Sequence, residues 1–150
     1  LFLNHNKIAI SDVIYECKRL NETALDKDLF DIIYNHNLFN QIKSSNINEI
    51  LFTSGFQKNN AFKLFYEGIL NKKITKEIKV NRGVTLENSI FGRQIKLTVL
   101  YSPSGSANIG ISKSKEYLIN KEYYQKHQNP ITHFKIQYYK KQFSTINQYL

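Results

Sequence analysis

The sequence predicts an α/β fold and, within that class, a three-layer α/β/α domain with a short, mainly parallel central sheet. Three apolar runs, at residues 7–11, 49–54 and 96–101, have the length of buried strands. Segments with helical spacing of apolar residues follow the first two runs, and a polar loop with further helical segments follows the third. Such alternation is typical of parallel sheets, because parallel strands need a crossover between them. A chain of 150 residues is expected to form one domain over 1–150.

In the first third of the chain, residues 7–11 (KIAIS) are predicted to form a strand. Asp12 follows at its end, where a carboxylate can cap a helix containing Cys17. Apolar residues between positions 25 and 45 recur at helical spacing, and His36 with its neighbouring asparagines is expected to divide them into two helices.

The middle of the chain carries the clearest strand signals. Residues 49–54 (EILFTS) predict the second strand, and an amphipathic helix is expected over 61–69. Residues 72–95 have the pattern of an irregular hairpin with two glycine-containing turns. Residues 96–101 (KLTVLY) predict the third strand.

Beyond this strand, Ser102-Pro103-Ser104-Gly105 must leave the sheet, because proline and small residues stop a strand. A helix is predicted over 114–127. A final helix is predicted to begin at Pro130, with Asn129 as its N-cap, and to run to about Tyr149.

Composition excludes several classes of protein. Cys17 is the only cysteine, so neither an internal disulfide framework nor a cysteine-rich zinc site is possible. No run of eighteen apolar residues predicts a membrane span, and a bacterial cytoplasmic protein is expected. The 21 lysines and arginines outnumber the 12 acidic residues, for a net charge of +9. This excess suits a nucleic-acid partner, but lysines spread over a solvated surface explain it equally well.

Ligands of parallel α/β sheets bind at the carboxyl ends of the strands. Three segments are therefore expected to meet on one face, at residues 11–12, 53–55 and 102–108. The loop 102–108 (SPSGSAN) is the most informative, because its small residues let backbone amides approach a phosphate closely. On spacing alone an ordinary surface turn and a helix-capping Asp12 are the alternatives.

Five segments in register resemble the uracil-DNA glycosylase superfamily, most closely its hypoxanthine (deoxyinosine) and mismatch-type branch. They are residues 7–19 (KIAISDVIYECKR), 24–29 (ALDKDL), 52–55 (FTSG), 102–105 (SPSG) and 130–143, where Pro130-Ile131-Thr132 and Tyr139-Lys140-Lys141-Gln142-Phe143 match a closing helix. The resemblance extends over nearly the whole chain.

This resemblance implies a DNA glycosylase of base excision repair, a hydrolase that cleaves the N-glycosidic bond of a deaminated base, uracil or hypoxanthine, flipped out of DNA. No metal or organic cofactor is expected. The expected partner is duplex DNA containing a damaged or mismatched base, and the protein is expected to act as a monomer.

The resemblance also assigns roles to residues. Ser102 and Asp12 are the expected catalytic residues, and Ser11, Asp12 and Ser54 the expected base pocket. The expected DNA-binding residues are Ser104, Gly105, Ser106, Ala107, Asn108 and Lys113.

The chain departs from the family pattern at three places. The family's first catalytic motif, on a central N-terminal strand, is absent, so we expect a chain that is N-terminally incomplete by about 40 residues. Ser102 stands where other branches have histidine or asparagine, and 109–129 resembles an insertion. Two alternatives stay open: a non-catalytic DNA-binding relative, and an unrelated small-molecule α/β enzyme.

Overall fold

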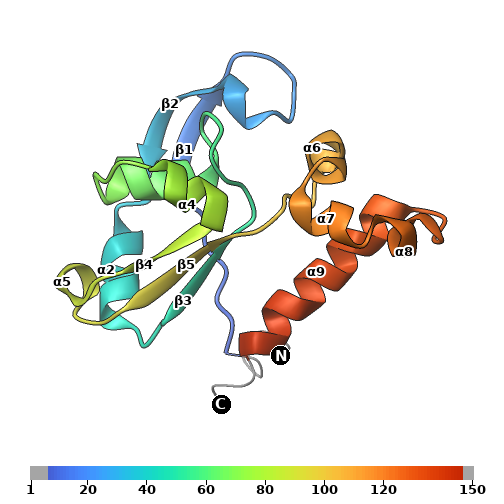
Figure 1. Cartoon of the computed structure of the whole chain (residues 1–150). Coiled ribbons are helices and arrows are strands. Elements are labelled where there is room, and N and C mark those ends of the chain that lie inside the picture. Colours follow the sequence, from blue (N-terminus) through green and yellow to red (C-terminus); the bar gives the residue numbers. More distant parts are fainter. Residues whose placement is uncertain (1–6, 147–150) are drawn as a thin grey trace. The chain divides into compact units, whose positions relative to one another are not determined.

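The structure, a computed structural model, describes residues 7–146, which divide into two compact units (Figure 1). The sheet unit comprises residues 9–100, and the helical unit comprises residues 101–146 with residues 7 and 8. Strands and helices occur together in the chain, which confirms the predicted α/β class. The single domain expected over 1–150 stays a prediction.

The sheet unit contains a three-stranded sheet of β3 (Glu49–Phe52), β5 (Ile95–Val99) and β4 (Gly83–Leu86), in the order β3-β5-β4. β3 pairs with β5 in parallel, as the sequence predicts, whereas β4 pairs with β5 antiparallel. The expected mainly parallel sheet is therefore found only in the β3–β5 pair. β5 lies in the middle, and it alternates buried and more exposed residues because one face packs on the core.

A second, two-stranded sheet consists of β1 (Ile14–Arg19) and β2 (Leu29–Tyr34), which pair antiparallel. The predicted helices over these residues are wrong, including the helix that Asp12 was expected to cap. β-Branched and aromatic side chains in both segments favour extended backbone, and pairing across the strands outweighs an approximate helical spacing. The connection contains the short 3-10 helix η1 (Asp26–Asp28).

The strand predicted at residues 7–11 is also wrong. Residues 8–11 adopt no regular secondary structure, and 78% of Ile10 is exposed to solvent. A strand needs hydrogen bonds to a neighbour, and no strand of the described chain pairs with this segment. A short apolar run is therefore insufficient evidence for a buried strand.

Helices connect the strands of the sheet unit. Their bounds are α2 Asn37–Ser44, α3 Ala61–Lys63, the π-helix η2 Leu64–Ile69, α4 Lys76–Asn81 and α5 Asn88–Phe91. The predicted helix over 61–69 and the second helix after His36 are confirmed. The predicted hairpin over 72–95 is only partly right, because α4 precedes β4 and α5 lies between β4 and β5. The two turns are helix C-caps, at which Arg82 and Gly92 have positive φ angles.

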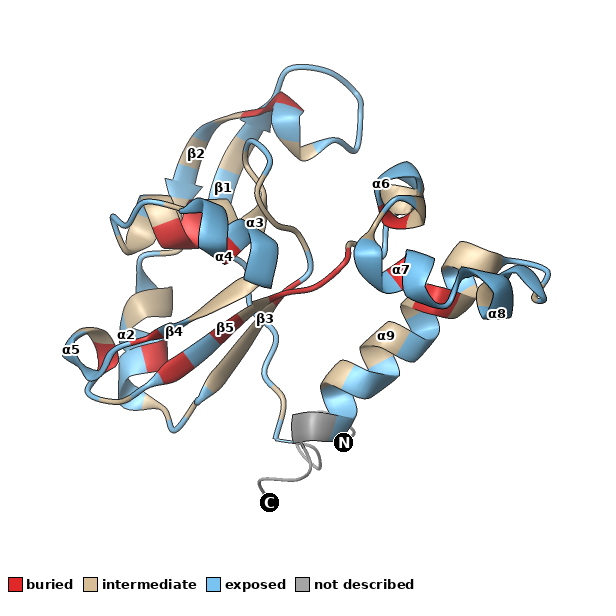
Figure 2. Cartoon of the chain, in the orientation of Figure 1, coloured by how far each residue is buried: buried red, intermediate tan, exposed pale blue. Residues whose placement is uncertain are grey.

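The core of the sheet unit is rich in aromatic rings. Phe62 is fully buried and Phe52 and Phe65 are nearly so. Figure 2 shows buried residues along β5, the middle strand of the same unit. The Phe52 ring lies 5.3 Å from both the Phe62 and the Phe65 ring, measured between centroids. Burial of such large rings contributes most of the free energy that holds β3 against the α3–η2 segment.

Arg93 connects the C-terminal end of α2 with the segment that precedes β3 and with the end of α5. Its guanidinium donates to the carbonyl oxygens of Ile42 at 2.7 Å, Ile47 at 2.8 Å and Phe91 at 3.2 Å. Arg93→Met is expected to lower the free energy of unfolding by about 2–3 kcal/mol, because these acceptors lose a charged donor near a helix C-terminus. Urea unfolding measures this change, and Lys43→Met, at an exposed position on the same helix end, is the control. Equal midpoints for the two variants would contradict the role of Arg93.

The helical unit begins at Tyr101 and contains five helical segments. They are η3 Gly105–Ala107, α6 Asn108–Ser112, α7 Lys115–Ile119, α8 Lys121–Gln125 and α9 Pro130–Ile146. The helix predicted over 114–127 is present as two short helices, α7 and α8. The start of the final helix at Pro130 is confirmed, and its predicted end near Tyr149 lies outside the described residues. No helix of residues 7–146 is long and apolar enough to span a membrane.

The helical unit has its own small core, in which Tyr101, Ile111, Tyr117 and Phe134 are buried. Ile111 and Tyr117 belong to the stretch 109–129, which the resemblance treats as an insertion. This stretch therefore supplies part of the core on which α9 packs, and its status as an insertion stays a prediction.

His127, just after α8, and His133, in the first turn of α9, lie face to face with ring centroids 3.6 Å apart. Desolvation, and then the positive charges of His127 and Lys140, lower the pKa of His133 below its ordinary value of 6.5. His133 therefore binds a proton more readily in the unfolded chain than in the folded one. The contribution of the neutral His133 to the free energy of unfolding is complete above pH 6.5 and falls as the pH drops toward the lowered pKa. We expect the α8–α9 connection to loosen in mild acid, which an NMR titration of the imidazole protons measures. In His127→Gln the pKa of His133 should rise, and an unchanged value would contradict the coupling.

Candidate nucleic-acid interface

The loop predicted from small residues, Ser102 to Asn108, follows the buried Tyr101 of the helical unit. The Ser104 amide donates to Ser102 Oγ at 3.2 Å, and the Ser106 amide donates to Ser104 Oγ at 3.3 Å. The hydroxyl oxygens of Ser104 and Ser106 are 2.9 Å apart. Each of the first two serines therefore stabilises a local turn through its oxygen.

The Ser102 hydroxyl retains the capacity to act as a donor. Its oxygen accepts a hydrogen bond from a backbone amide, whereas its proton is available for an acceptor outside the loop. Accepting one hydrogen bond polarises the hydroxyl and strengthens it as a donor to a second group. The half-buried position of Ser102 is suited to a group that approaches from solvent.

The remaining predicted DNA-binding residues continue along the same segment. Gly105, Ser106 and Ala107 form η3, and Asn108 begins α6. Lys113 is exposed and caps the C-terminal end of α6 through its backbone amide. Ser102, the predicted catalytic serine, and the six predicted DNA-binding residues thus lie on one short stretch of the helical unit.

Lys135, on α9, is the residue that sequence reasoning missed. Its ammonium donates to the carbonyl oxygens of Pro103 at 3.2 Å and Ser104 at 2.8 Å, and to Asn108 Oδ1 at 2.7 Å. Nothing in the sequence signals this contact, because about thirty residues separate the lysine from its acceptors. Tyr139, one turn further along α9, donates to the carbonyl oxygen of Tyr101 at 2.8 Å.

The predicted base-pocket residues lie in the sheet unit. Ser11 and Asp12 are exposed and precede β1 instead of following a strand. Asp12 Oδ1 accepts from the Ile14 amide at 3.0 Å, and Ser54 Oγ accepts from the Ala61 amide at 2.8 Å. Both side chains thus support local backbone turns. The expected meeting of these residues with the loop 102–108 stays a prediction.

Asp12 also takes part in a small group of charges. Burial raises the pKa of Asp26, Arg19 opposes that rise, and the negative charge of Asp12 adds to it. Arg19 in turn donates to the carbonyl oxygens of Thr23 and Leu25. The carboxylate of Asp12 therefore lies within electrostatic reach of the connection between β1 and β2.

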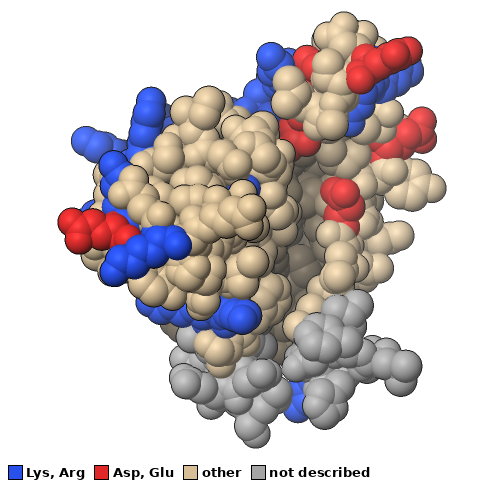
Figure 3. Space-filling view, turned by 90° about the vertical axis from the view of Figure 1, so that its right-hand side faces the viewer, with Lys and Arg blue, Asp and Glu red and all other residues tan. Residues whose placement is uncertain are grey.

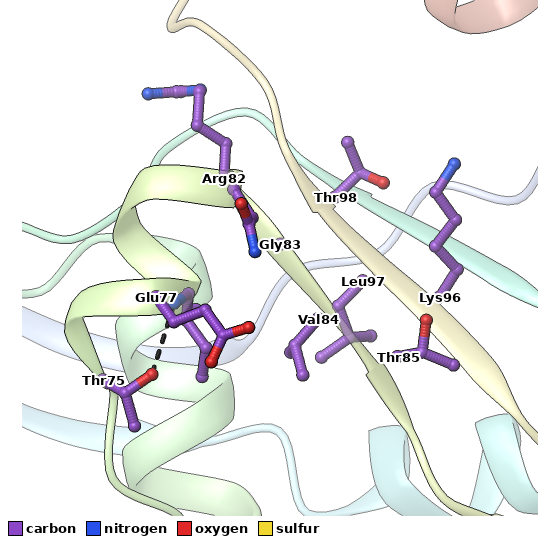
Figure 4. Close-up of a pocket in the computed structure, with 11 residues that line it drawn as sticks. Thr75, Glu77, Arg82, Gly83, Val84, Thr85, Lys96, Leu97 and Thr98 are labelled. Atoms are coloured by element: carbon purple, nitrogen blue, oxygen red, sulfur yellow. Dashed lines mark hydrogen bonds between the residues drawn. The ribbon is translucent and has the colours of Figure 1, made fainter.

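A pocket of about 560 Å³ opens in the sheet unit between α4 and strands β4 and β5 (Figure 4). Leu97 and Ile78 are its buried apolar residues, and Thr85, Thr98 and Glu77 are among its polar ones. None of the residues predicted for a site lines this pocket. Among residues 7–146, no group of three or more His, Cys, Asp or Glu side chains is arranged to hold a metal ion.

Positive charge is concentrated in the C-terminal third of the chain. Residues 101–150 contain seven lysines and two glutamates, a net charge of +5 that exceeds half of the total of +9. On the face that Figure 3 shows, basic side chains are interspersed with uncharged and acidic ones and form no continuous band. The excess therefore favours attraction of an anion to this part of the chain without defining a groove.

Comparison with known proteins yields no match: no family model, no curated protein and no solved structure is similar to this chain.

Proposed function

We propose that the protein is a DNA glycosylase that excises a deaminated base, uracil or hypoxanthine, from duplex DNA. The observation that carries the proposal is the Ser102 hydroxyl, which accepts from the Ser104 amide and keeps its proton for an incoming acceptor. It lies in the loop that resembles the glycosylase family, within a segment of net charge +5. These features support the binding of DNA and the stabilisation of an anionic leaving group.

In the proposed reaction the damaged nucleotide leaves the duplex stack and its base enters a pocket. The bond between C1′ and the base nitrogen breaks and the base takes the bonding electrons. A water oxygen then bonds to C1′, and the water proton neutralises the base. Ser102 donates a hydrogen bond to the departing base, so its contribution is electrostatic.

The remaining roles follow the resemblance. Ser11, Asp12 and Ser54 would contact the base, and the residues from Ser104 to Asn108 with Lys113 would hold the flanking phosphates. A carboxylate such as Asp12 only accepts hydrogen bonds, whereas the edge of uracil also needs a donor. Hypoxanthine presents a ring N–H beside a carbonyl oxygen as uracil does, so with either base Asp12 would accept from the N–H and another group would donate to the carbonyl.

The finer fold is part of the same proposal. A three-layer α/β/α domain of the uracil-DNA glycosylase type would contain a further central strand. Among the described residues no strand pairs with the second edge of β3, so that edge can accept such a strand.

The test uses the full-length gene product that contains this chain. Labelled duplexes with uracil, hypoxanthine or xanthine are incubated with the protein, and abasic sites are then cleaved with alkali. Strand breakage at one lesion is the expected result and identifies the base. Absence of breakage at all three lesions would contradict the enzymatic proposal.

A second candidate is a DNA-binding relative without catalysis. It is favoured by Ser102, which stands where other branches of the resembled family have histidine or asparagine as the group that contacts the leaving base. Salt-sensitive duplex binding without base release would establish this second function.

A further inference from the structure

The ammonium group of Lys135 has three N–H groups and three acceptors. Two acceptors are successive backbone carbonyls, of Pro103 and Ser104, and the third is the side-chain oxygen of Asn108. Burial lowers the pKa of Lys135 from its ordinary value of 10.5. The three acceptors act in the opposite direction and favour the charged ammonium, because a neutral amine has only two N–H groups to donate. The nitrogen then has no lone pair, which excludes Lys135 as a nucleophile in this conformation.

These contacts orient two successive peptide groups. The described peptide bonds are trans, so the N–H of each peptide points away from its own carbonyl oxygen. With the Pro103 and Ser104 carbonyls directed at Lys135, the Ser104 and Gly105 amides must face the opposite side of the loop. The Ser104 amide there meets Ser102 Oγ. The space beside Gly105 is open: apart from Gly105 itself and its two chain neighbours, no atom lies within 4 Å of the position that a Cβ would occupy.

We infer that Lys135 is a positioning residue, which holds the loop in one conformation. In that conformation the Gly105 amide faces a DNA phosphate and the Ser102 hydroxyl faces the leaving base. The DNA part of this inference rests on the proposed function. Lys135 contacts the side of the loop that carries the Pro103 and Ser104 carbonyl oxygens, because all its N–H groups are directed at loop oxygens. Its charge also offsets the carbonyl dipoles of the loop, which favours an anion on the amide side.

The experiment compares the wild type with Lys135→Met and with Lys141→Met, a control at an exposed lysine of the same helix. ¹⁵N relaxation reports the order of the Ser104 and Gly105 amides. In Lys135→Met their order parameters should fall from about 0.85 to below about 0.6, while Lys141→Met keeps the wild-type values. Duplex affinity at low salt should fall about tenfold further in Lys135→Met than in Lys141→Met.

Asn108→Ala provides a second variant if Lys135→Met fails to fold. It removes one of the three acceptors and keeps the charge of Lys135, so a smaller loss of order in the Ser104 and Gly105 amides is expected. Wild-type order parameters in this variant, or in Lys135→Met, would overturn the inference.

The outcomes separate this inference from the proposed function. If the wild type binds no duplex but the loop loses order in Lys135→Met, the role in DNA binding is refuted, whereas the conclusion that Lys135 positions the loop is retained. If the wild type binds duplex DNA but Lys135→Met and Lys141→Met have equal loop order and equal affinity, only the role of Lys135 is refuted.

Discussion

Phe62→Ala is expected to lower the free energy of unfolding by about 3–5 kcal/mol. The Phe62 side chain has no exposed surface, and its ring lies 5.3 Å from those of Phe52 and Tyr66 and 5.5 Å from that of Phe56. Its removal would leave a cavity lined by rings that cannot all move inward. Domains of this size have about 5–15 kcal/mol of stability in total, so the loss is a large fraction. Denaturant unfolding measures it.

Phe62→Leu and Phe143→Ala are the matched variants. Leucine keeps much of the apolar volume and should cost less than half as much as alanine. Phe143 is 38% exposed on α9, so its replacement by alanine should change stability by less than about 1 kcal/mol. If Phe62→Ala and Phe143→Ala unfold at the same denaturant concentration, the ring cluster is not the centre of this core.

The central strands could be predicted from sequence because their signal is local. Residues 49–54 and 96–101 are short apolar runs that are followed directly by small residues, Gly55 and Ser102, and they contain the parallel pair β3 and β5. The segment that forms β1 and β2 could not be predicted, because its helical spacing and its β-forming residues conflict. Pairing between the two strands decides the outcome, and the run at 7–11 has no such partner among the described strands.

The candidate site shows the same division between local and distant contacts. The loop from Ser102 was recognisable because Pro103 and Gly105 leave few other conformations for it. Lys135 was invisible in the sequence, since its acceptors are brought to it only by the packing of α9. Asp12 and Ser54 are predicted pocket residues, and in the structure each also accepts a hydrogen bond from a backbone amide.

Ser102→Ala is expected to slow base release about a hundredfold, because it removes the donor proposed to stabilise the departing base. Duplex affinity should change by less than about threefold, since the phosphates are assigned to the following residues of the loop. The loss would therefore fall on kcat, as expected for an interaction formed in the transition state. Single-turnover excision from the preferred lesion duplex measures the rate of base release without product dissociation.

Two further variants separate the hydroxyl donor from a general disturbance of the loop. Ser102→Thr keeps both the acceptor for the Ser104 amide and the donor proton, so most of the activity should return. Ser112→Ala removes a hydroxyl that bonds to the Ile109 carbonyl oxygen in α6, outside the loop, and should leave excision unchanged. If Ser102→Ala excises the base within about threefold of the wild-type rate, Ser102 is not the leaving-base donor. Equal losses of affinity and rate in Ser102→Ala would instead assign the hydroxyl to DNA binding, because uniform binding affects ground state and transition state alike.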